Sequence, residues 1–75
     1  MILSCNVRVK LPNGSMATFQ IVDAEVISDE IPIWEEAFLY AGGKKKRYLP
    51  GDLPQNIIDQ INEDLEEEAL SRQKE

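Results

Sequence analysis

The sharpest chemical feature of the sequence is a run of four consecutive cations: Lys44, Lys45, Lys46 and Arg47. Aromatic residues lie on both sides of this run, and they are Trp34, Phe38, Tyr40 and Tyr48. Cations beside aromatic rings suit nucleic acid, because phosphates attract the charges and bases stack on the rings. Trp, Tyr and Arg also supply much of the binding energy of protein interfaces. A solvated turn that protects a strand edge is the competing interpretation.

Acidic residues near the C-terminus form a second candidate. Residues 51–75 carry the whole net charge of −6, because the charges of residues 1–50 cancel. This region should repel nucleic acid and anionic membranes, although its spaced carboxylates could also imitate DNA phosphates and fill a partner's basic groove. Adjacent acids among residues 63–68 point in different directions on a helix, so we expect a solvated face and no metal site.

Groups that commonly perform catalysis are scarce. The sequence has no histidine and a single cysteine, Cys5, which an alternating pattern places on the inward face of a strand. The segment 41–44 lacks the spacing of a phosphate-binding loop. We therefore expect a protein that is not an enzyme and that has no catalytic residues, cofactor or metal. The lone cysteine and the lack of a membrane-length apolar run favour the cytoplasm.

A hairpin near the N-terminus is predicted by strict alternation of apolar and polar residues over 3–11. If Asn13 and Gly14 formed a two-residue loop, Val7 would face Gln20, and the buried face would be wasted. A type I turn from Pro12 with Gly14 in the left-handed position keeps that face intact. The pairs predicted by this choice are Val9 with Ala17, Val7 with Phe19, and Cys5 with Ile21.

The middle of the chain leaves more alternatives open. The apolar phase changes after Ile21, which predicts a β-bulge near Ile21 and Val22. Residues 31–41 fit a helix that starts near Pro32, and they also fit a strand that turns at 42–43 and returns to Leu49. We favour the hairpin, because it covers an otherwise open edge of the sheet.

The C-terminal region predicts an amphipathic helix over residues 53–72. Asp52 and Gln55 would form a capping box, with Pro54 in the first turn. The expected apolar stripe consists of Leu53, Ile57, Ile58, Ile61 and Leu65. Residues 73–75 are expected to be a frayed tail.

These elements predict one α+β domain over residues 1–75: a small antiparallel meander of three to four strands, with its β-rich part at 2–49, packed against the C-terminal helix. In style the chain resembles the small accessory proteins of tailed bacteriophages and prophages. That resemblance rests on a short β-rich body, the link 49–54 (Leu-Pro-Gly-Asp-Leu-Pro) and an acidic terminal helix. It covers most of the chain, and it assigns no functional residue.

The function predicted from these features is non-enzymatic binding of a protein partner through the aromatic and basic hairpin. The partner-binding residues would be Trp34, Phe38, Tyr40, Lys44, Lys45, Lys46, Arg47 and Tyr48. Nucleic-acid binding through residues 44–47 is one alternative. Inhibition by DNA mimicry, through the acidic helix, is the other. No membrane contact is expected, and the sequence leaves the oligomeric state open.

Overall fold

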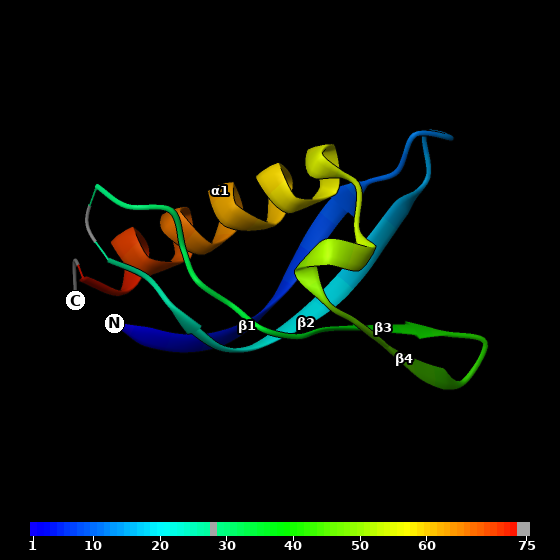
Figure 1. Ribbon diagram of the computed structural model, residues 1–75, viewed down its shortest axis with the longest axis horizontal. Coiled ribbons are helices and arrows are strands. Elements are labelled where there is room, and N and C mark those ends of the chain that lie inside the picture. Colours follow the sequence, from blue (N-terminus) through cyan, green and yellow to red (C-terminus); the bar gives the residue numbers. More distant parts are fainter. Residues whose placement is uncertain (28, 74–75) are drawn as a thin grey trace.

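The computed structural model describes residues 1–27 and 29–73, with the side chain of Gln73 left out. Its elements follow the chain in the order β1 (Ile2–Lys10), β2 (Met16–Glu25), β3 (Ala37–Ala41), β4 (Lys44–Tyr48), a 3-10 turn (Pro50–Asp52) and α1 (Gln55–Gln73). The four strands form one antiparallel sheet in the order β1-β2-β3-β4. Figure 1 shows α1 along the β1–β2 part of the sheet, while the β3–β4 hairpin projects away from it. The predicted α+β meander with one C-terminal helix is confirmed.

The first hairpin has the predicted register. Val9 pairs with Ala17, Val7 with Phe19, and Cys5 with Ile21. Gly14 adopts a φ of 88°, the left-handed region that favours glycine, and its N–H donates to the Leu11 carbonyl at 2.9 Å. The turn therefore keeps the apolar side chains of both strands on one face.

A bulge bends the far end of this hairpin. Leu3 pairs with Ala24 and Cys5 with Ile21, so one residue of β1 faces both Val22 and Asp23 on β2. Asp23 has a φ of 54°, and its N–H donates to the Ser4 hydroxyl at 3.0 Å. The bulge predicted from the change of apolar phase is confirmed.

Residues 37–48 form the favoured hairpin and no helix. Gly42 and Gly43 have φ values of 58° and 75°, as a two-residue type I′ turn requires. The segment before β3 is not a continuous strand. It touches the sheet through an isolated bridge, in which Ile33 and Glu25 exchange hydrogen bonds of 2.7 and 2.9 Å.

The predicted C-terminal helix is confirmed, but it begins at Gln55, two residues later than predicted. Asp52 belongs to the preceding 3-10 turn, where its carboxylate accepts the Leu49 N–H at 3.2 Å. Gln55 bonds to Asp59 instead of closing a capping box, and the Pro54 carbonyl accepts the first helical hydrogen bonds. The helix begins at Gln55 because Asp52 is already engaged. At its other end Gln73 is helical, and residues 74 and 75 lie outside the described residues.

The core lies between the sheet and α1. The helix buries the stripe Ile57, Ile61, Leu65 and Ala69, while Leu53 and Ile58 are half-buried at its margin. From β1 and β2 the core receives Leu3, Val7, Val9, Phe19, Ile21 and Ala24. Full burial of an aliphatic side chain stabilises a fold by about 1.5–3 kcal/mol, so this contact supplies most of the driving force for folding.

Candidate interaction surfaces

The four cations do not form a single cluster. They make up most of β4, and side chains of a strand alternate between its two faces. Lys46 pairs with Leu39 on the side of the core, whereas Arg47 pairs with Phe38 and Lys45 with Tyr40 on the opposite side. We call this opposite side, which points away from α1, the outer face of the sheet.

Contacts on the outer face join the hairpin aromatics to these cations. The Lys45 Nζ lies 4.1 Å from the centroid of the Phe38 ring and 5.8 Å from that of Tyr40. Tyr40 is 59% exposed, and its hydroxyl donates to Gln20 at 3.3 Å. Arg47 pairs with Glu36 at 3.4 Å. The outer face therefore presents exposed aromatic rings. Its two cations, Lys45 and Arg47, already have partners within the chain.

A hollow of about 560 Å³ continues this face from Phe38 and Lys45 towards the β2 bulge. Two exposed aliphatic side chains line it, Val22 at 38% and Ile33 at 57%. The remaining lining residues are Asp23, Glu25, Trp34, Glu35 and Glu36. We call it the outer-face hollow. Neither aliphatic residue was among the predicted site residues. The change of phase grouped Val22 with Ala24 and Val26 as one apolar set, but the bulge leaves Val22 partly exposed while Ala24 and Val26 are buried.

Two predicted interface residues are engaged mainly in packing, although Trp34 also lines the outer-face hollow. Trp34 is 6% exposed, and its indole N–H donates to the side-chain oxygen of Asn62 on α1 at 2.9 Å. Tyr48 is half-buried on the core side, with its ring edge-on to Phe19 at 5.9 Å between centroids. Both rings serve packing. Of the predicted residues, the structure brings Phe38, Tyr40, Lys45 and Arg47 together, and it places Lys44 and Lys46 on the other face.

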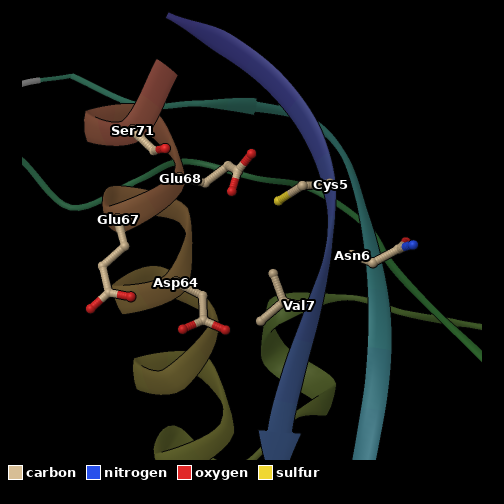
Figure 2. A pocket seen from close by; sticks show the side chains of 7 residues that line it. All are labelled: Cys5, Asn6, Val7, Asp64, Glu67, Glu68 and Ser71. Atoms are coloured by element: carbon tan, nitrogen blue, oxygen red, sulfur yellow. The ribbon is translucent and has the colours of Figure 1, made fainter. Parts of the chain in front are cut away.

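A second hollow, of about 430 Å³, separates β1 from the C-terminal half of α1. Figure 2 shows Cys5 and Val7 pointing from β1 towards the helix, which presents carboxylates at the opposite rim. The lining residues are Cys5, Asn6, Val7, Asp64, Glu67, Glu68 and Ser71. We call this hollow the acidic groove.

Electrostatics in the acidic groove act on Cys5. Burial raises the pKa of its thiol above the ordinary value, the nearby Glu68 carboxylate raises it further, and Arg72 partly opposes them. A raised pKa keeps the thiol protonated and unreactive at neutral pH. Among the described residues, no three acidic or cysteine side chains are grouped closely enough to hold a metal ion.

No helix in the described part of the chain has the length and apolarity needed to cross a membrane. Comparisons with protein-family models, with curated proteins and with solved structures found no match to this chain.

Proposed function

We propose that this chain is a non-enzymatic interaction protein that binds a protein partner through the outer face of its sheet. The observation that carries the proposal is the outer-face hollow, where the exposed Val22 and Ile33 meet Phe38 and Lys45. Apolar surface gathered in one concave place, with charged groups at its rim, is typical of protein contact sites.

The chemistry of the outer-face hollow indicates what the partner offers. An apolar side chain of the partner would fill the space between Ile33 and Phe38, and it would displace water from both. Lys45 and the carboxylates of Glu25 and Glu35 lie at the same hollow, so polar groups of either sign on the partner can be matched. Tyr40 would extend the contact along β3, as an exposed ring with a polar tip.

Nucleic-acid binding by residues 44–47 has less support. Strand alternation divides the cations between two faces, and Arg47 is already paired with Glu36. A strand of nucleic acid that followed one face would meet two of the four cations.

We place the protein in the cytoplasm on its cysteine usage. An origin in a tailed bacteriophage or prophage remains a prediction from the resemblance of the chain to the small accessory proteins of those phages.

The test compares two outer-face variants with a matched control. Ile33→Ser and Tyr40→Ala remove exposed side chains of the outer face, and Leu70→Ser removes one of nearly equal exposure on α1, 58% against 57% for Ile33. Affinity capture with mass spectrometry would identify a partner, and calorimetry with the purified partner would then measure its affinity for each variant.

We expect each outer-face variant to weaken binding at least tenfold, and Leu70→Ser to leave it unchanged, because central apolar contacts carry most interface energy. Equal binding by all three folded variants would contradict the assignment of the outer face. A parallel titration with single- and double-stranded oligonucleotides at low salt tests the alternative, in which binding weakens steeply as salt is added.

A further inference from the structure

A third hollow, of about 520 Å³, lies between α1 and the segment that precedes β3. It shares no lining residue with the outer-face hollow. Its apolar lining consists of Ile31, Pro32 and Ile58. Ile31 is 75% exposed, more than any other large apolar side chain among the described residues. We call this space the helix-side hollow.

Hydrogen bonds hold the walls of the helix-side hollow in place. The Trp34 indole donates at 2.9 Å to Asn62, which lines the hollow on α1. The segment is also joined to β2, where Ile33 and Glu25 exchange backbone hydrogen bonds of 2.7 and 2.9 Å. Ile31 is therefore carried by an anchored segment. A ligand would meet a preformed site, and binding to a preformed site loses less free energy to ordering.

Three exposed carboxylates of α1 form the charged rim of the hollow, and we call Asp59, Glu63 and Glu66 the rim carboxylates. Among the described residues, no cation lines this hollow, and neither ion pair includes a rim carboxylate. Asp59 accepts a hydrogen bond from the Gln55 amide at 2.9 Å, which leaves its charge unopposed. Like charges at i,i+3 and i,i+4 on a helix repel one another, so a cationic ligand would relieve this repulsion.

The other two hollows have less one-sided charge. Lys45 lines the outer-face hollow together with acidic residues. In the acidic groove, Glu68 already pairs with Arg72 at 3.1 Å. The helix-side hollow therefore offers the clearest charge complementarity to a cationic ligand, and it places that charge beside exposed apolar surface.

The spacing of the rim carboxylates indicates the shape of the ligand. They lie at i, i+4 and i+7 on one face of α1, and they span about 10 Å of helix at 1.5 Å per residue. Lysines or arginines at the same spacing on a second helix span the same distance. An amphipathic helix that lays its apolar face into a hydrophobic groove is a recurring mode of recognition.

We propose that the helix-side hollow binds a cationic amphipathic helix of a partner protein. An apolar side chain of that helix packs over Ile31 and Ile58, and its lysines or arginines lie against the rim carboxylates. A second copy of this chain is a poor occupant, because its helix over Gln55–Gln73 is acidic and has Arg72 as its one cation. The site is separate from the outer face, so this proposal does not rest on the proposed function.

The probe is a fluorescein-labelled helical peptide of about 15 residues, with leucines at i, i+3, i+4 and i+7 and lysines on both sides of that face. One control peptide has glutamate in place of every lysine. A second has the same composition in an order that forms no apolar face. Fluorescence anisotropy would measure the affinities at about 0.15 M salt, where the screening length is about 8 Å and distant charges contribute little.

Two variants of the protein remove the two kinds of contact. Ile31→Ser removes the exposed apolar side chain, and Glu63→Gln with Glu66→Gln removes two of the three rim charges. We expect each variant to bind the probe about tenfold more weakly than the unaltered protein, and neither control peptide to bind measurably. The altered side chains are exposed, and circular dichroism would check that the fold is kept.

Matched controls separate this site from the rest of the surface. Ile33→Ser alters the outer-face hollow, and Asp64→Asn with Glu67→Gln alters the acidic groove with the same change in net charge. Both should bind the probe within about twofold of the unaltered protein, because their charges are screened from the rim. Failure of the proposed function would leave these results unchanged, since the outer face takes no part in them.

Amide chemical shifts would locate the bound probe. We expect Ile58, Asn62 and Glu63 to shift on its addition, and Phe38 and Tyr40 to stay in place. The proposal is overturned if the probe does not bind at about 1 mM. It is also overturned if Ile33→Ser weakens binding as much as Ile31→Ser, or if the two charge variants weaken it equally, because binding would then be at the outer face or by net charge alone.

Discussion

The hydrogen bond between Trp34 and Asn62 should be the main tie between the segment before β3 and the helix. The indole N–H donates to the Asn62 oxygen at 2.9 Å, across 28 residues of chain, and the ring is 6% exposed. A 75-residue domain has about 4–11 kcal/mol of stability in total, at roughly 0.05–0.15 kcal/mol per residue. Trp34→Ala would cost about 3–5 kcal/mol, so it would leave the domain close to unfolding.

A double-mutant cycle isolates the hydrogen bond from the burial of the ring. Trp34→Phe keeps an aromatic ring and leaves the half-buried Asn62 to bond with water, whereas Asn62→Leu leaves the indole N–H without its partner. The unpaired donor should cost about 1–3 kcal/mol, and the coupling energy of the cycle should be about 1 kcal/mol.

Urea unfolding followed by far-ultraviolet circular dichroism would measure all four proteins, with the m-value checked for constancy. Trp34→Phe with Asn62→Leu should be less destabilised than the sum of the single changes, because the double variant has no unpaired group. Additive effects, with a coupling energy below about 0.3 kcal/mol, would refute the reasoning that this bond ties the segment to the helix.

Three further outcomes are expected. The folded-state pKa of Cys5 is raised, so its contribution to stability is present below the ordinary value of 9.0 and is lost as the pH rises through the folded-state value. Alkylation of the thiol should accordingly have its midpoint above pH 9.0, and Glu68→Gln should lower that midpoint; an upward shift would contradict the assigned cause. Ile61→Ala should lower the free energy of unfolding in urea by about 2–5 kcal/mol, since the side chain is fully buried. A decrease below about 1 kcal/mol would contradict this, because it would mean that neighbouring side chains fill the cavity. Gln60→Ala should speed amide exchange at Lys10 about tenfold relative to the rest of β1, and unchanged exchange there would mean that the bond is not maintained in solution.

Structural features that depend on neighbouring residues in the chain were predicted well from the sequence. The register of the first hairpin follows from keeping Val7 and Val9 on one face, and the bulge follows from the change of apolar phase after Ile21. In each case one chemical requirement, burial of a single face, selects between alternatives. The choice of hairpin over helix for residues 37–48 rested on the open edge of β2, which β3 does cover.

Features that depend on distant partners were predicted less well. Trp34 was assigned to the interface as a surplus aromatic, because its acceptor lies 28 residues further along the chain. The start of α1 was misplaced because Asp52 could cap either of two turns, and the sequence does not rank them. The cations were treated as one cluster, although the predicted strand already implied that Lys45 and Lys46 lie on opposite faces.

The order of the strands has a consequence for how the chain folds. Each strand pairs with its neighbour in sequence, so the sheet can form through local contacts, and such topologies fold quickly. Within the described residues, the docking of α1 on β1 joins the two ends of the fold. A growing polypeptide would therefore complete its strands before Ile57, Ile61 and Leu65 have been synthesised to cover them. During that interval the apolar face of β1 and β2 is open to chaperones and to misassociation, and this exposure ends once α1 has been synthesised and has docked.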